Sequence, residues 1–208
     1  MESKIDIKTS NQNIEYFDAL NFMETRVDKI LNNQENEMLW FLNHNHIYTC
    51  GTSANKNEIL FQTNIPILQT NRGGKTTYHG PGQRIVYFMI NLNKRKKDIR
   101  KLIRNIEKCI IYTLKEFNIN SQNDKKNIGI WIKKKQESMK VAAIGIRVKK
   151  WIAYHGFSIN IDNDLSAYKN IIPCGLYKKK ITNLISIKNK KFHSIDDKII
   201  KNFLRIFK

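Results

Sequence analysis

Glycine is scarce in this chain and is concentrated at one point. Only nine of the 208 residues are glycine, and four of them fall within the segment 72–83, between two apolar runs. Glycine lacks a Cβ atom, so it permits positive φ angles and lets a ligand approach backbone N–H groups closely. The segment therefore predicts a loop that either cradles a ligand oxygen or makes two tight turns, and the glycines alone leave both interpretations open. It lacks the Gly-x-x-x-x-Gly-Lys-Ser/Thr spacing of a P-loop.

Apolar residues recur at helical spacing in three other segments, 13–31, 98–117 and 193–207. Shorter apolar runs bounded by Asn, Gly or Pro predict strands at 37–42, 65–68, 84–92, 128–132, 141–148 and 151–161. Lys149 and Lys150, between the last two runs, suit a hairpin turn exposed to water. A chain of this length is sufficient for one domain of ordinary size, so we expect a single domain over 1–208 with a mixed α/β layered architecture.

The chain is strongly basic, with 37 Lys and Arg against 18 Asp and Glu and a net charge of +19. Such an excess is typical of proteins that bind nucleic acid, a membrane surface or an acidic protein. Ile, Lys and Asn, however, together supply 87 of the residues. A bias toward A/T-rich codons would raise the lysine content without any function, so both explanations stay open. The lysine runs are more typical of solvated faces than of a nucleic-acid stripe.

Three cysteines occur, Cys50, Cys109 and Cys174, with no Cys-x-x-Cys pair. An odd count without such a pair argues against a disulfide framework or a thiolate zinc site and favours a reducing cytoplasm. The sequence shows neither an apolar run of about 20 residues nor the apolar segment of a signal peptide, so we expect a cytoplasmic protein without a membrane span.

Lys140 directly precedes a run of small and apolar residues that predicts a buried strand. Burial lowers the pKa of an amine, which would let this lysine accept a proton near neutral pH or pair with an anion. The alternative is an ordinary lysine at a solvated strand end.

Cys174 lies between Pro173 and Gly175 in a predicted turn, whereas Cys109 lies on the apolar face of a predicted helix. A thiol in a loop is accessible, and only its thiolate is a strong nucleophile, so a nearby cation would increase its reactivity at pH 7. Lys140, His79 or His155 could supply that cation, and the residues alone do not choose among them.

His44 and His46 alternate and could share one face of a strand as metal ligands. No third ligand follows at a suitable spacing, so we expect no metal site. Cys50 closes a predicted strand, and we expect it to be structural or to line a pocket.

Several long motifs occur in the order seen in lipoyl(octanoyl) transferases. They are Arg-Gly-Gly-Lys-Thr-Thr-Tyr-His-Gly-Pro-Gly-Gln at 72–83, Lys-Val-Ala-Ala-Ile-Gly-Ile-Arg at 140–147, Tyr-His-Gly-Phe at 154–157 and Pro-Cys-Gly at 173–175. The chain resembles this family over roughly residues 12–185. The resemblance implies the fold of the biotin and lipoate ligase catalytic core, an α/β (α+β) domain with a mixed sheet flanked by helices. One departure is Asn45-His46, where the family usually has Pro-Pro.

The resemblance also implies an activity. Members of the family transfer an octanoyl group from octanoyl-acyl carrier protein to a specific lysine of lipoyl domains, without ATP, as the first step of protein lipoylation. The implied acceptors are the lipoyl domains of 2-oxoacid dehydrogenase complexes and the glycine cleavage H protein. No cofactor is implied, and we expect a monomer with neither a membrane nor a nucleic-acid partner.

Carried over by position, the resemblance implies that Cys174 takes the acyl group as a thioester and that Lys140 lowers the pKa of its thiol. Further positions are expected to line the acyl pocket: Arg72, Gly73, Gly74, Lys75, Thr76, Thr77, Tyr78, His79, Ala143, Ile144, Gly145, Gly156, Phe157 and Ser158. Two other hypotheses stay open, an ATP-using lipoate or biotin ligase on the same fold and a nucleic-acid-binding module suggested only by the charge.

Overall fold

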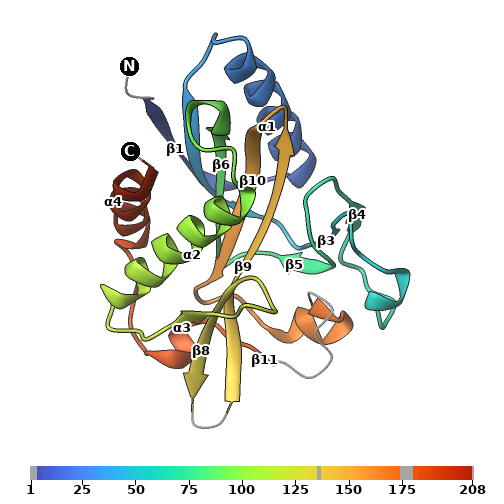
Figure 1. Cartoon of the computed structure of the whole chain (residues 1–208). Coiled ribbons are helices and arrows are strands. Elements are labelled where there is room, and N and C mark those ends of the chain that lie inside the picture. The colour runs from blue at the N-terminus through green and yellow to red at the C-terminus, as the bar shows by residue number, and fades with distance from the viewer. Residues whose placement is uncertain (1–3, 135–136, 174–179, 208) are drawn as a thin grey trace.

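A large mixed sheet with helices on both faces forms the centre of the molecule, and a small sheet lies beside it (Figure 1). A computed structural model describes residues 4–134, 137–173 and 180–207. Within these residues the large sheet has eight strands in the order β1-β2-β6-β10-β9-β8-β7, with β11 beside β9. β1 runs parallel to β2 and β11 parallel to β9, whereas the other neighbours are antiparallel. The expected mixed sheet flanked by helices is therefore confirmed.

The strands of the large sheet are β1 (Ile5–Ile14), β2 (Glu37–His44), β6 (Gln83–Asn91), β7 (Gln122–Asn123), β8 (Ile130–Lys134), β9 (Glu137–Lys149), β10 (Ile152–Asn160) and β11 (Lys180–Ile181). The small sheet has the order β4-β3-β5, with β3 (Ile47–Cys50), β4 (Ile67–Gln69) and β5 (Thr77–His79). The helices are α1 (Tyr16–Leu31), α2 (Ile99–Lys115), α3 (Leu184–Ile187) and α4 (Ile195–Phe207), with short 3₁₀ turns η1 (Lys56–Glu58), η2 (Leu92–Lys94) and η3 (Ser166–Asn170).

Both faces of the central strands are buried, which explains their nearly continuous apolar sequences. In β2, Leu39 and Phe41 belong to the core beneath α2 and α4, whereas Trp40 and Leu42 belong to the core beneath α1. Side chains of a strand alternate between its faces, so one apolar run supplies both cores.

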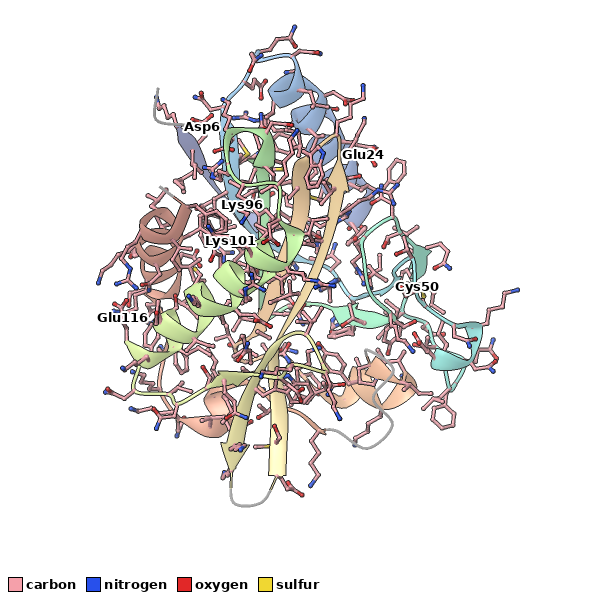
Figure 2. All side chains as sticks on the ribbon, in the orientation of Figure 1. Asp6, Glu24, Cys50, Lys96, Lys101 and Glu116 are labelled. Atoms are coloured by element: carbon pink, nitrogen blue, oxygen red, sulfur yellow. The ribbon has the colours of Figure 1, made fainter. Side chains whose placement is uncertain are left out.

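α2 carries its apolar residues on one side and its charges on the other, as its periodicity predicts. Cys109 lies in the core on this apolar side, and burial raises the pKa of its thiol to about 12. Asp98 caps the helix by accepting a hydrogen bond from the Lys101 amide at 2.8 Å. Lys101 itself is exposed, as are Lys96 just before the helix and Glu116 just after it (Figure 2). Because Cys109 lies among the buried apolar residues of this helix, it is a packing residue.

The hairpin between β9 and β10 is confirmed, but its turn lies one residue later than predicted. Lys149 pairs with Ile152, and the two turn residues are Lys150 and Trp151. Their φ angles of 48° and 65° are both positive, as in a type I′ turn, whose twist matches that of the flanking strands.

Several elements differ from the predicted ones: β1 was not predicted, β8 and β9 have other bounds than 128–132 and 141–148, and α4 begins two residues later than 193. The segment 13–31 is helical only from Tyr16, because Asn13 and Ile14 end the edge strand β1. The predicted strand at 65–68 is β4, which begins two residues later at Ile67.

No helix in the described ranges is long and apolar enough to cross a membrane.

The core beneath α2 gives a direct test of the packing. Ile110 is fully buried there, whereas Ile99, at the start of the same helix, is 40% exposed. We expect Ile110→Ala to lower the free energy of unfolding by about 2–5 kcal/mol, because it removes buried methyl groups and leaves a cavity. Ile99→Ala, the same substitution on the same helix, should cost less than about 1.5 kcal/mol. Urea unfolding measures both, and equal losses would contradict this assignment of the core.

Candidate active site

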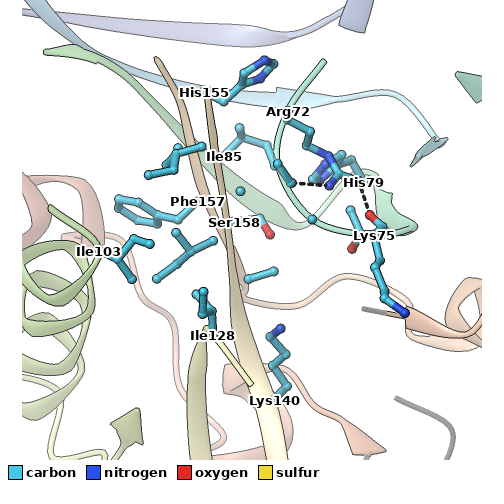
Figure 3. A pocket seen from close by; sticks show the side chains of 18 of the residues that line it. Arg72, Lys75, His79, Ile85, Ile103, Ile128, Lys140, His155, Phe157 and Ser158 are labelled. Carbon is cyan, nitrogen blue, oxygen red and sulfur yellow. Dashed lines mark hydrogen bonds between the residues drawn. The ribbon is translucent and has the colours of Figure 1, made fainter. Parts of the chain in front are cut away.

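A cavity of about 510 Å³ lies between the glycine-rich loop and the strands β9 and β10 (Figure 3). All of the predicted pocket residues except Thr76 and Tyr78 line it, and Lys140 lines it as well. Apolar side chains from three further elements complete the wall, among them Ile85, Ile103 and Ile128. The structure therefore brings together segments that lie far apart in the sequence.

The glycine-rich loop is hydrogen-bonded to β9. The Gly73 amide donates to the Ile146 carbonyl at 3.0 Å. A Cβ atom at Gly73 would lie 2.7 Å from the same carbonyl oxygen, and one at Gly145 would lie 3.1 Å from the Gly73 carbonyl. Real Cβ atoms essentially never lie 2.7 Å from a backbone oxygen, so the close approach requires glycine at position 73.

The buried side chain of Arg72 stabilises the loop through hydrogen bonds to backbone carbonyls. Its guanidinium is buried and donates to the carbonyls of Thr49 at 2.5 Å, Gly73 at 3.0 Å and Lys75 at 2.8 Å, and also to the Thr49 hydroxyl. These backbone acceptors compensate the cost of burying the charge. Arg72 therefore shapes the wall of the cavity by tying the loop to β3.

Thr76 and Tyr78, which we expected in the pocket, face away from it because their side chains alternate with those of Lys75, Thr77 and His79. The Thr76 hydroxyl contacts the Cys50 sulfur at 3.5 Å. The Tyr78 hydroxyl hydrogen-bonds with His46 Nδ1 at 2.6 Å, and burial raises the pKa of Tyr78 to about 12. Both side chains support the loop from behind.

The histidines near the cavity are neutral at pH 7. Burial lowers the pKa of His79 to about 3, with further lowering from His44 and Arg72. Burial likewise lowers the pKa of His155 to about 3 and that of His44 to about 4. His79 and His155, proposed from the sequence as possible cations, therefore supply no positive charge at neutral pH.

His44 and His46 do not converge on a metal. His44 Nδ1 lies 2.6 Å from the Ile14 carbonyl and its Nε2 lies 2.8 Å from the Tyr87 hydroxyl, so both ring nitrogens are occupied. Among the described residues no three His, Cys, Asp or Glu side chains gather as a possible metal site.

Lys140 is buried in β9, with only 4% of its surface exposed, and its amine lies 5.6 Å from the centre of the Trp131 ring. Figure 3 shows the amine directed toward the cavity. A Cβ atom on Gly129 would lie 2.4 Å from Lys140 Cε, so the glycine there, at φ +136°, leaves room for the lysine stem. The alternative of a solvated strand end is wrong for Lys140.

Cys174 and Gly175 lie outside the described residues. The described chain reaches Pro173, which lines a small cavity together with Lys140, Thr77 and Ser158. Pro173, the residue before Cys174, therefore lies near Lys140 and near the wall of the main cavity.

Sequence reasoning missed several residues of this site. Ile103 and Ile128 line the cavity, as does Tyr87, but each lies in an element whose apolar pattern gives no sign of a pocket. These residues reach the cavity because α2, β6 and the segment before β8 pack together. The hydrophobic pattern within a single element does not predict such packing between elements.

Comparison with known proteins identifies the family. Residues 15–205 match the lipoyl protein ligase A/B catalytic domain. The chain belongs to this family. It is 43% identical over 205 residues to the octanoyltransferase of Anaplasma phagocytophilum, covering 98% of this chain and 99% of that protein. It is 46% identical over 200 residues to the octanoyltransferase of Wolbachia pipientis wMel, covering 95% and 97%.

Solved structures of lipoate protein ligases share the fold. The bipartite lipoate protein ligase of Thermoplasma acidophilum superposes with a TM-score of 0.72 at 13% identity, covering 99% of this chain and 84% of that one. Lipoate–protein ligase A bound with ATP superposes with a TM-score of 0.71 at 14% identity, covering 99% and 85%. The expected ligase-like fold is thus confirmed.

The buried histidines predict a stability that depends on pH. The unfolded chain, with an ordinary histidine pKa near 6.5, binds protons that the folded chain does not, so the free energy of unfolding falls as the pH drops from 7 to 5. Each such histidine contributes up to about 2 kcal/mol to this fall. Urea unfolding at several pH values measures it.

His79→Gln should make this pH dependence shallower, whereas His193→Gln should leave it unchanged, because His193 is exposed. A pH dependence that is the same in the wild type and in His79→Gln would contradict the assignment.

Proposed function

We propose that this protein is an octanoyltransferase that moves an octanoyl group from octanoyl-acyl carrier protein to a lysine of a lipoyl domain, through a thioester on Cys174. The observation that carries the proposal is the placement of buried Lys140 on the cavity wall, beside the end of the segment that leads to Cys174. The octanoyltransferase names of relatives that are 43% and 46% identical support it.

The cavity suits a medium-length acyl chain. Ile85, Ile103, Ile128, Ile144 and Phe157 give it an apolar wall. Burying seven apolar carbons at about 0.8 kcal/mol each contributes on the order of 5 kcal/mol to binding. One methylene more or less changes this only slightly, so selection of chain length by the pocket alone is modest.

In the proposed first step the Lys140 ammonium stabilises the Cys174 thiolate, which attacks the carbonyl carbon of the donor thioester. Of the three cations considered from the sequence, only Lys140 remains, because His79 and His155 are neutral. Backbone N–H groups of the glycine-rich loop or of the turn at Gly175 would stabilise the tetrahedral oxyanion. The bond from the carbonyl carbon to the donor sulfur then breaks, and the donor thiolate takes a proton from Lys140.

In the proposed second step the acceptor lysine attacks the acyl-enzyme. Lys140, now neutral, accepts a proton from the attacking nitrogen, and the bond from the carbonyl carbon to the Cys174 sulfur breaks. An amide forms, and the thiolate and ammonium are restored. Exchange between thioesters is nearly isoenergetic and amide formation from a thioester is downhill, so the reaction requires neither ATP nor a cofactor.

Mass spectrometry of the intact protein tests this mechanism. After exposure to octanoyl-acyl carrier protein without ATP, the wild type should gain one octanoyl group, and Cys174→Ala should gain none. Lys140→Ala should form the adduct at least about 100-fold more slowly, because general acid–base groups contribute this much.

Cys50→Ala and Cys109→Ala are the matched controls, since both thiols are buried, and both variants should still be acylated. An adduct that survives in Cys174→Ala would reject the mechanism, and transfer that requires ATP would favour a ligase, as on the related fold of lipoate–protein ligase A.

The net charge of +19 predicts a dependence on salt if it steers acidic partner proteins. At limiting octanoyl-acyl carrier protein, the rate of acylation should fall at least about tenfold between 50 and 500 mM salt, because the association is screened. With a small uncharged octanoyl thioester as donor, the rate should change less than about twofold. Equal salt dependence for the two donors would favour codon bias as the origin of the charge.

A further inference from the structure

Glu58 is a buried carboxylate that contacts the glycine-rich loop. It ends the turn η1 and is only 4% exposed. Its Oε2 accepts a hydrogen bond from the Thr76 amide at 2.9 Å, and its Oε1 lies 3.3 Å from the Lys75 amine. Thr76 stands between Lys75 and Thr77, which both line the cavity. The carboxylate therefore fixes the backbone of the cavity wall.

The backbone of the same residue holds the segment before Cys174. The Ile172 amide donates to the Glu58 carbonyl at 2.7 Å, and the Leu60 amide donates to the Asn170 carbonyl at 2.8 Å. Ile59 and Ile171 between them form an antiparallel bridge. This short ladder ends two residues before Cys174 in the sequence.

A small core lies behind the ladder and stabilises it. Tyr48 and Tyr78 of the small sheet pack with Ala167 and Ile171. The Tyr48 hydroxyl also donates to the Ala167 carbonyl at 2.6 Å. The segment 167–172 is thus held against the small sheet, and Glu58 joins it to the glycine-rich loop.

We propose that Glu58 is a positioning residue that fixes the distance between the loop backbone at Thr76, whose neighbours line the cavity, and the segment 170–172 that precedes Cys174 in the sequence. The inference rests on the proposed function, since it assigns the spacing to the acyl-transfer step. Glu58 lies outside the cavity lining and acts through Thr76 and Ile172. A displacement of about 1 Å between reacting groups can lower a rate by about 100-fold, which sets the expected scale of its effect.

The chain offers a matched control in Glu37 at the start of β2. Glu37 is 1% exposed, accepts a hydrogen bond from the Asn91 amide at 2.6 Å and pairs with Arg95. Like Glu58, it is a buried carboxylate that binds one backbone amide and one cation, but neither Glu37 nor its partners line the cavity. Substitution of Glu37 therefore reproduces the loss of stability without changing the site.

The test compares Glu58→Ala and Glu58→Gln with the same substitutions of Glu37. We expect Glu58→Ala to slow acyl-enzyme formation at saturating octanoyl-acyl carrier protein by about 30- to 100-fold, with the half-saturating donor concentration within about threefold of the wild type. Glu58→Gln keeps an oxygen that can accept from the Thr76 amide, so it should recover at least about tenfold of that loss. Both Glu37 variants should acylate within about threefold of the wild type while losing similar thermal stability.

Hydrogen exchange provides a readout that is independent of acyl transfer. In Glu58→Ala, exchange should accelerate at the Thr76 amide, which loses its side-chain acceptor, whereas the Ile172 amide keeps the backbone carbonyl of residue 58. Glu37→Ala should leave both amides unchanged. If Glu58→Ala acylates as fast as Glu37→Ala, or if its Thr76 amide exchanges as in the wild type, the inference is overturned and the proposed function stands. If the wild type forms no octanoyl adduct, the proposed function fails, and the assignment of Glu58 to acyl transfer falls with it.

Discussion

The hydrogen bond between the Gly73 amide and the Ile146 carbonyl is the interaction on which the cavity depends. It closes the glycine-rich loop onto the edge of β9, and the absence of a side chain at Gly73 makes the contact possible. Arg72 also fixes the loop, by donating hydrogen bonds to the backbone carbonyls of Thr49, Gly73 and Lys75. With both attachments, a segment rich in glycine becomes a defined wall, although glycine by itself favours conformational freedom.

Burial determines the electrostatics around this wall. His44, His79 and His155 lie within the protein, and desolvation keeps them neutral. Lys140 is also buried, but it lines a small cavity together with Pro173, the residue before Cys174. In the proposed chemistry the neutral histidines give the acyl chain an uncharged surface, whereas Lys140 is the cation that stabilises the thiolate.

Much of this architecture could be predicted from the sequence. The apolar faces of α2 and α4 follow from strong periodicity, the central strands follow from continuous apolar runs, and the motifs identify most of the cavity lining. β1 was missed because it is an edge strand of mostly polar residues, none of them fully buried, which carry little periodicity. Glu58 was missed because a glutamate in a polar segment is ordinarily solvated, and its burial results from contacts with residues 18 and 114 positions away in the chain.

The small sheet is formed by an insertion between the antiparallel neighbours β2 and β6. β2 and β6 are neighbours in the large sheet, with Leu42 paired to Ile85, and the whole segment between them leaves the sheet and returns to the same place. Both cores of the large sheet can therefore close whatever this insertion contains. A scaffold built in this way can vary the loops between β2 and β6 while its framework persists, which is consistent with a fold that is shared at 13% identity.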